Sequence, residues 1–539
     1  MRLINASTGL LEDHPSPSYN EHNLFQPQTP PYAILSHTWL AAQDEVTFQD
    51  FLYSPDRGQS KAGFTKIRYS CEQALQDGLR YVWVDTCCID KTSSAELSEA
   101  INSMHAWYRL SAVCYVYLAD VSRVSFNGAD DPQFRRSRWY SRGWTLQELL
   151  APKQMQFYSS QWLPFGSKEE LAVTISEITG IDSAFITGEK DIMEASVAQR
   201  MSWAANRQTT RTEDVAYCLL GIFDVHIPLI YGEGKKAFIR LQEEIIRKSE
   251  DQSIFAWSSE LITRRVSVGA LAESPAWFRE SGNIVPCDIG DAWDPPSVTS
   301  RGIHIQAPRW RVEKSSKDSG LRQVLLKCRR QDDLFGVLAL PVRVVQYNNA
   351  MYVRDTRLKL NTIEYANWRK EMKNPVGPEK LYLIDPSSLR SVNSTQRECG
   401  FVIRSMPDSY GGYSVSIAQP SELWVKKEGF FSTYCGGYQD PIYAVLVPKE
   451  LGANCFILRM ILRDIEPAKP PSCTITLAPS GGSMGRLEIH GGETWFKSMP
   501  WAHNSLEVSV EEQLLFGSRM FVIDIKERRG ERITKEAHI

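Results

Sequence analysis

The sequence predicts an α/β domain with a parallel sheet flanked by helices, then a helical extension and a β-rich C-terminal domain. Three short apolar runs that end in polar residues predict buried strands, and they lie at 32–39, 81–91 and 112–118. Helical patterns at 61–77 and 93–110 separate these runs. Strands that alternate with helices at this spacing favour a parallel sheet with helices on both faces.

The rest of the chain divides by composition into an arm, a helical region and a β-rich region. The arm carries five prolines among polar residues, so we expect it to be mostly irregular, with one short strand at 2–5. Expected helices in the extension lie at 168–178, 197–206, 212–223 (with Thr212 as N-cap) and 235–250. Short β-type runs of a sandwich or barrel lie at 302–307, 323–328, 336–342, 444–447, 473–477 and 520–525. The predicted domains are 1–31, 32–160, 161–258 and 259–539.

Composition narrows the class of protein. The chain has 539 residues, which is too long for one core, and its 42% hydrophobic and 23% charged residues are ordinary for a globular protein. A formal net charge of −3 argues against a general binder of nucleic acid or membrane surfaces. No apolar run has the length of a membrane span or a signal peptide. We therefore expect a cytoplasmic protein with no membrane span and no nucleic-acid partner.

The eleven cysteines are dispersed and form no C-x-x-C pair. This pattern favours reduced core thiols and predicts no metal site. Cys87 and Cys88 fall within the second apolar run, so we expect them to point to opposite faces of a strand.

Polar side chains follow the predicted strands. Ser36 and His37 end the first strand, while Asp85 and Asp90 lie at and beyond the end of the second. Because ligands of open α/β sheets bind beyond the carboxyl ends of the strands, we expect these side chains to gather at one edge.

The run at 141–150 predicts a turn that enters a helix. Leu146, Leu149 and Leu150 are spaced to bury one face, and Glu148 lies at the edge of that stripe. Two interpretations stay open for this carboxylate. It is either a solvated glutamate beside a buried helix, or a partly buried group whose raised pKa suits acid or base work.

Three blocks of sequence stand together in order. They are Tyr32-x-x-Leu35-Ser36-His37-Thr38-Trp39, Tyr81-Val82-Trp83-Val84-Asp85-Thr86-Cys87-Cys88-Ile89-Asp90-Lys91 and Arg142-Gly143-Trp144-Thr145-Leu146-Gln147-Glu148. In this order, over about a quarter of the chain, they closely resemble the fungal heterokaryon-incompatibility (HET) domain. The stretch at 200–234 resembles the helical extension often found after that domain. The resemblance implies a fungal protein that acts in non-self recognition and triggers cell death.

The HET domain in turn resembles TIR domains, which implies a TIR-like fold for the α/β region. The run Ser141-x-Gly143-Trp144-x-x-x-Glu148-Leu149 is similar to the S-x-x-W-C-x-x-E-L stretch of TIR sequences, with Thr145 where cysteine is usual. By this resemblance Glu148 is the catalytic residue of NAD hydrolysis, and it stabilises the oxocarbenium-like ribose as nicotinamide leaves. NAD is then a substrate, and no cofactor is expected.

The same resemblance implies which residues hold the nucleotide. Ser36, His37 and Trp39 would line its site, and Arg142 would pair with the pyrophosphate. Trp144 either stacks on a base or packs in the core.

The two aspartates are weighed separately. Asp85 ends a buried strand, where a carboxylate must be paired or functional, so we assign it to the site. Asp90 is either a site residue or only a turn or helix cap. His37 replaces the tyrosine frequent in HET sequences, and a general-base role for it lacks a definite partner in the sequence.

A non-enzymatic function is the alternative. In that case the HET domain self-associates or recruits a partner to signal cell death, and Glu148 only anchors the fold. The partner that triggers the protein is not encoded in any recognisable motif, and the β-rich domain is the candidate for sensing or regulation. A protease or nuclease is disfavoured, because no Ser/His/Asp, Cys/His or metal constellation is present.

Overall fold

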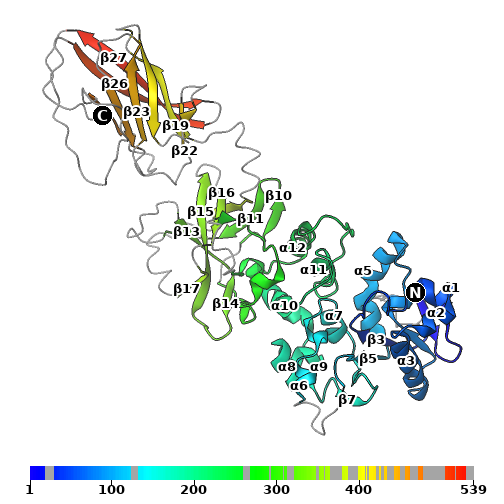
Figure 1. The fold of residues 1–539 in the computed structure, drawn as a ribbon. Helices are drawn as coiled ribbons and strands as arrows, with labels where there is room; N and C mark the ends of the chain where they lie inside the picture. The colour runs from blue at the N-terminus through cyan, green and yellow to red at the C-terminus, as the bar shows by residue number, and fades with distance from the viewer. Residues whose placement is uncertain are drawn as a thin grey trace.

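The computed structural model describes most of the chain. It covers residues 1–539 except 18–28, 123–130, 259–266, 290–292, 308, 312–320, 347–350, 357–358, 365–378, 386–398, 407, 409–411, 420–423, 426–429, 434–441, 450–455, 462–471, 478–503, 516–517 and 530–539. Figure 1 shows the fold.

The N-terminal region contains a mixed sheet built around parallel strands. Within the described residues its order is β2-β1-β4-β3-β5-β6-β7, in which β4, β3, β5 and β6 are parallel neighbours. The strands are β1 (Arg2–Asn5), β2 (Leu10–Asp13), β3 (Tyr32–His37), β4 (Tyr81–Trp83), β5 (Val113–Tyr117), β6 (Met155–Tyr158) and β7 (Pro164–Ser167). The short strand expected at 2–5 is confirmed, and with β2 it forms a hairpin that extends the sheet past β4.

Helices follow the parallel strands and cover the sheet (Figure 1). They are α1 (Phe48–Tyr53), α2 (Pro55–Ser60), α3 (Phe64–Gln76), α4 (Asp85–Cys88), α5 (Ser94–Leu110), α6 (Pro132–Arg135), the 3-10 turn η2 (Arg138–Ser141) and α7 (Thr145–Leu150). Ser93 caps α5 by accepting a hydrogen bond from the Glu96 backbone. Helix α3 contacts β3 and β4, while α7 contacts β3 and α5.

Aromatic packing joins α5 to the centre of the sheet. Trp83 of β4 is fully buried and meets Trp107 and Tyr108 of α5 edge to face. The Tyr108 hydroxyl donates to the backbone carbonyl of Leu35 in β3 at 3.1 Å. These contacts fix the end of β3 against α5.

The strand expectation for Cys87 and Cys88 is wrong. Strand β4 ends at Trp83, and the chain turns at once into the short helix α4, which carries both cysteines. The apolar, β-branched run at 81–89 has strand propensity, but the tertiary fold overrides it. As a result Asp85 opens a helix directly beyond a strand.

The helical extension contains shorter helices than the sequence predicts. They are α8 (Ala172–Thr179), α9 (Ser183–Thr187), η3 (Ile192–Glu194), α10 (Val197–Ala204), α11 (Asp214–Tyr217), α12 (Lys236–Lys248) and η4 (Gln252–Phe255). The helix expected at 212–223 reduces to α11, and Glu213 rather than Thr212 precedes it. No helix among the described residues is long and apolar enough to cross a bilayer.

The C-terminal part is β-rich, as predicted. A first sheet has the order β10-β11-β18-β16-β15-β13-β12, and β17 and β8 pair with its members; β14 and β9 form a separate ribbon after η6 (Pro275–Phe278). These strands are β8 (Ser267–Val268), β9 (Ile284–Pro286), β10 (Ser297–Thr299), β11 (Gly302–Ala307), β12 (Arg309–Arg311), β13 (Leu321–Leu325), β14 (Cys328–Arg330), β15 (Gly336–Gln346), β16 (Met351–Asp355), β17 (Asn361–Glu364) and β18 (Glu379–Leu383). Each predicted run at 302–342 contains or overlaps a strand.

Two further sheets share a separate hydrophobic core, to which Phe401, Ile442 and Phe521 belong. Their orders are β21-β22-β19-β27-β26 and β20-β23-β24-β25. The strands are β19 (Cys399–Ser405), β20 (Tyr413–Gln419), β21 (Trp424–Val425), β22 (Phe430–Thr433), β23 (Ile442–Pro448), β24 (Phe456–Ile461), β25 (Ser472–Leu477), β26 (Asn504–Leu515) and β27 (Ser518–Arg529). Two sheets around one core make a sandwich.

Candidate functional site

The carboxyl ends of β3 and β4 bring polar side chains together. His37 ends β3, and its Nε2 lies 2.9 Å from Oδ1 of Asp85, which opens α4 just beyond β4. The Trp39 indole Nε1 donates to Oδ2 of the same carboxylate at 2.9 Å. Two of the side chains that were predicted to gather at this edge of the sheet, His37 and Asp85, are therefore in direct contact.

This edge is where the strand order reverses. The chain passes from β3 to β4 on one side and then to β5 on the other side of β3. In open α/β sheets, ligands bind outside the carboxyl ends of the strands at such a reversal. Ser36 and His37, at the end of β3, occupy that position.

Glu148 reaches the same strand from α7. Its Oε2 accepts a hydrogen bond of 2.5 Å from the Ser36 hydroxyl, and that hydroxyl in turn accepts a bond of 2.8 Å from Nε1 of Trp139. Glu148 is only 7% exposed. The interpretation of Glu148 as a solvated surface residue is therefore wrong.

The two carboxyl groups of the site have opposite environments. Burial raises the pKa of Glu148 to about 8, and the charge of Asp85 adds to this while the Ser36 hydrogen bond opposes it. Burial also acts to raise the pKa of Asp85, but Lys91, His37 and Lys66 outweigh it and hold that pKa well below its usual range. At neutral pH the free protein thus holds Glu148 protonated and Asp85 ionised.

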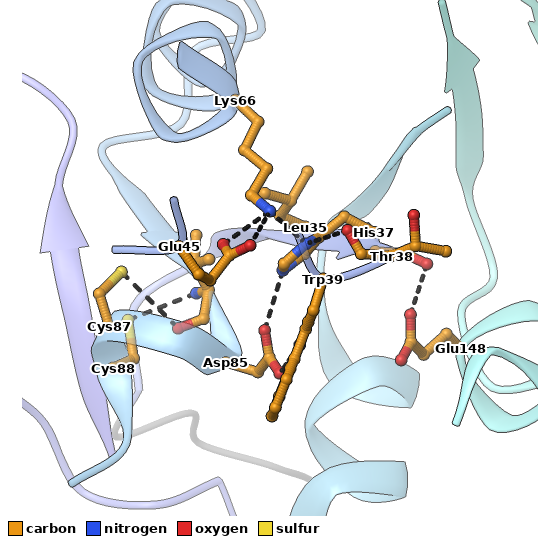
Figure 2. Close-up of polar contacts among 12 residues, drawn as sticks. Leu35, His37, Thr38, Trp39, Glu45, Lys66, Asp85, Cys87, Cys88 and Glu148 are labelled. Atoms are coloured by element: carbon orange, nitrogen blue, oxygen red, sulfur yellow. Dashed lines mark hydrogen bonds and ion pairs between the residues drawn. The ribbon is translucent and has the colours of Figure 1, made fainter. Parts of the chain in front are cut away.

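A buried lysine contacts the ring nitrogen of His37 that does not face Asp85. Lys66 of α3 is 2% exposed, and its Nζ lies 2.8 Å from Nδ1 of His37 and 2.7 Å from a carboxylate oxygen of Glu45. Figure 2 shows the Lys66 side chain reaching Glu45 and His37, with Asp85 on the far side of the imidazole. Sequence reasoning found neither Lys66 nor Glu45, because a lysine in an amphipathic helix is usually solvated.

Trp39 lies on the solvent-exposed side of Asp85. Its side chain is 47% exposed, and the Lys91 ammonium lies 3.8 Å from the centroid of its ring. The hydrogen bond to Asp85 fixes the indole, so an exposed aromatic face stands beside an ionised carboxylate.

Three other predicted site residues have different surroundings. The Arg142 guanidinium donates to Oγ1 of Thr210 at 3.3 Å. Trp144 is half-buried, packs against the main core and hydrogen-bonds with Asp214, which agrees with its core interpretation. Asp90 behaves as a turn residue, since its Oδ1 accepts from the backbone and the hydroxyl of Thr92.

Residues of the helical extension hydrogen-bond to the turn that leads to Glu148. The Gly143 N–H donates to the carbonyl of Gln208 at 2.9 Å, and the Gln208 N–H donates to the carbonyl of Ser141 at 2.7 Å. Arg207 donates to the Arg142 carbonyl and to Oγ1 of Thr145, both at 2.9 Å. Sequence reasoning missed Arg207 and Gln208, because these contacts join residues more than 60 positions apart.

We predict that Gly143→Ala destabilises this turn. A Cβ at Gly143 would lie 2.5 Å from Cγ2 of Thr209 and 3.1 Å from Sγ of Cys218. Overpacking of this kind costs about 1–3 kcal/mol. Thermal unfolding should show the loss, and Thr209→Ser, which removes Cγ2, should restore part of it in the double variant. An unchanged Tm for Gly143→Ala alone would contradict this close packing of the turn against Thr209 and Cys218.

Metal and disulfide chemistry has no support in the described part of the chain. No group of three or more His, Cys, Asp or Glu side chains there could hold a metal ion. The described cysteine side chains are free thiols, at Cys71, Cys87, Cys88, Cys114, Cys218, Cys287 and Cys328.

Comparison with known proteins finds family matches for two parts of the chain. Residues 32–133 match the family model "Heterokaryon incompatibility protein (HET)", and residues 236–288 match a domain of unknown function, DUF8212. The chain is 50% identical over 221 residues to "Vegetative incompatibility protein HET-E-1" of Podospora anserina. That match covers 40% of this chain and 16% of the relative, so the chain spans only a small part of that protein. No solved structure matches the chain.

Proposed function

The chain is a fungal heterokaryon incompatibility (HET) domain protein, and from this premise we propose that its α/β domain hydrolyses NAD to nicotinamide and ADP-ribose. The loss of NAD would then trigger cell death in non-self recognition, in the cytoplasm where we expect the protein. The observation that carries the proposal is the buried Glu148 carboxyl, hydrogen-bonded to Ser36 at the carboxyl end of β3.

The chemistry needs a carboxylate at this position. When the N-glycosidic bond of NAD breaks, its electron pair leaves with nicotinamide, and the positive charge of the pyridinium ring passes to the ribose. A carboxylate beside the ribose stabilises this oxocarbenium-like species, and water then adds to give ADP-ribose and a proton. Glu148 is the group that we assign to this role.

The polar neighbours of Glu148 prepare it for this role. An indole N–H can only donate, so Trp139 occupies a lone pair of the Ser36 oxygen and directs the Ser36 hydroxyl proton toward Glu148. The free protein holds Glu148 protonated near neutral pH because burial raises its pKa to about 8. The positive nicotinamide ring of bound NAD would favour the ionised form, so substrate binding itself would generate the carboxylate.

Two further arguments support the proposal. One is the contrast between Glu148 and Asp85, since neighbouring groups whose pKa values are pushed apart are typical of acid–base sites. The other is the similarity of the segment at 141–149 to TIR sequences, from which we infer a TIR-like fold and the role of Glu148.

We also propose that the HET domain self-associates and that a protein partner triggers it.

The proposal predicts that Glu148→Gln removes NAD cleavage. The experiment measures nicotinamide release from NAD by the purified wild-type chain and by Glu148→Gln, at high protein concentration so that weak self-association is not limiting. We expect release by the wild type and a loss of about 10²–10³-fold in the variant, the range for one positioned group that stabilises the charge of a transition state. Circular dichroism checks that both proteins are folded.

Two results would contradict the catalytic assignment. Full cleavage by Glu148→Gln would remove Glu148 from the reaction. Absence of cleavage by a folded wild type, under all protein concentrations tested, would favour the alternative of a non-enzymatic interaction module in which Glu148 anchors the fold.

A further inference from the structure

A buried chain of three side chains runs from α3 to the site. It begins at Lys66, passes through His37 at the end of β3, and ends at Asp85 at the start of α4 (Figure 2). The Lys66–His37 contact is 2.8 Å and the His37–Asp85 contact is 2.9 Å. The His37 side chain is 1% exposed, so water does not compete for either ring nitrogen.

The direction of these hydrogen bonds follows from Lys66. An ammonium group has three N–H donors and no acceptor. Burial lowers the pKa of Lys66, but Glu45 opposes this and favours the ammonium form, since its two carboxylate oxygens lie 2.7 and 2.9 Å from Nζ. Nδ1 of His37 must therefore accept from Lys66, and the ring proton of a neutral imidazole must sit on Nε2.

The competing tautomer has weaker support. It would place a proton on Nδ1 and direct it to the Thr38 carbonyl, which lies 3.3 Å away. That contact is longer than the 2.8 Å to Lys66, and the proton would face an ammonium group. With the proton on Nε2, His37 donates to Oδ1 of Asp85.

Asp85 keeps acceptor capacity on its open side. His37 takes one lone pair of Oδ1 and Trp39 takes one of Oδ2. An ionised carboxylate offers about four acceptor positions, and the Lys91 ammonium, 4.0 Å from Oδ2, lies beyond hydrogen-bond distance, so each oxygen retains one position. The Asp85 side chain is 18% exposed, beside the exposed Trp39 ring. Two acceptors in one plane match two neighbouring hydroxyl donors.

We propose that Lys66 fixes the tautomer of His37, that His37 is a positioning residue for Asp85, and that Asp85 receives the vicinal ribose hydroxyls of the nucleotide. The ligand in this inference rests on the proposed NAD hydrolysis, whereas the tautomer does not. Because both ring nitrogens are committed, His37 is not a general base.

The first test reads the tautomer directly. Nitrogen-15 NMR of the full chain labelled at histidine, with His37 assigned by its loss in His37→Gln, should show a protonated Nε2 and an unprotonated Nδ1. A protonated Nδ1, or two protonated nitrogens, would overturn the proposal. This result does not depend on activity, so it stands whether or not the chain cleaves NAD.

The second test separates positioning from catalysis. In His37→Gln the side-chain amide keeps one acceptor for Lys66 and one donor for Asp85, while His37→Phe keeps a ring and loses both. We expect KM for NAD to change less than about threefold in the glutamine variant and to rise at least about tenfold in the phenylalanine variant. An equal and large loss of kcat in both variants would show that His37 acts on the reacting atoms and would overturn its positioning role.

The third test concerns Asp85 and its ligand. Calorimetric titration with NAD should show at least about tenfold weaker binding to Asp85→Asn than to wild type, and a smaller difference with an NAD analogue that lacks a ribose hydroxyl. If the wild type consumes NAD, the same comparison is made with Glu148→Gln in place of the wild type and with the double variant Glu148→Gln/Asp85→Asn in place of Asp85→Asn. Equal losses for NAD and the analogue would remove the hydroxyls as the ligand of Asp85. Binding without cleavage would defeat the proposed function and leave this inference standing.

Discussion

Glu148→Gln should stabilise the protein against unfolding by an amount that grows as the pH rises from 5 to 8.5. Burial raises the pKa of Glu148 from the ordinary value of 4.5 to about 8 in the folded protein. Between these values the folded state holds a proton that the unfolded chain has released, so wild-type stability falls with rising pH. The loss is about 1.4 kcal/mol per pH unit and on the order of 5 kcal/mol over the window. Glutamine does not ionise and avoids this loss.

The neighbours of Glu148 do not mask the effect. Asp85, whose pKa is held well below its usual range, stays ionised throughout this window. Unfolding by urea at several pH values, for wild type and Glu148→Gln, gives the difference directly. Glu177→Gln is the matched control, since the Glu177 side chain is 56% exposed and pairs with Arg135 on the surface. A stability difference for Glu148→Gln that does not change with pH would show that the carboxyl is not held protonated.

This stability cost bears on function. A glutamate that lowers stability at neutral pH has no structural advantage over glutamine at the same position. Sites that perform chemistry are where such costs are expected. If Glu148→Gln is both more stable and inactive, the carboxyl is retained for reaction and not as an anchor of the fold.

The order of strands and helices could be predicted because it depends on local pattern. The alternation of apolar runs with amphipathic segments placed β3, α3, β4, α5 and β5 in the right sequence, with ends shifted by a few residues. The exception is the segment after Trp83, where β-branched and apolar residues predicted a continued strand. Position in the fold decides there, because the chain must leave the sheet at Asp85 to begin α4.

The site could be predicted only in part, for a related reason. The rule that parallel strands end at one edge brought Ser36, His37 and Asp85 together correctly. Two residues that hold this region could not be found. Lys66 contacts His37, and Arg207 donates to the turn before Glu148, but both lie far from their partners in sequence and belong to types that are usually solvated. A buried lysine is recognised only when its carboxylate partner is seen.

Lys66→Met should destabilise the protein by about 3–5 kcal/mol, since it leaves the Glu45 carboxylate buried and without its cation. Thermal or urea unfolding measures the loss. Lys168→Met is the matched control. Lys168 is equally buried, but its ammonium donates to the Pro152 carbonyl at 2.5 Å, so removal leaves an unpaired carbonyl and costs about 1–3 kcal/mol. Similar losses in both variants would show that Lys66 and Glu45 do not form a charged pair.

The double variant Lys66→Met/Glu45→Gln decides what the pair is for. It removes both charges and keeps an acceptor for the Leu40 N–H, which donates to Glu45 at 2.9 Å, so most of the lost stability should return. Nδ1 of His37 still lacks its donor in this variant. If the double variant binds NAD more weakly than the wild type although its stability recovers, Lys66 is required to orient His37 toward Asp85. If binding recovers with stability, the pair serves only the fold, and the tautomer of His37 is set without Lys66.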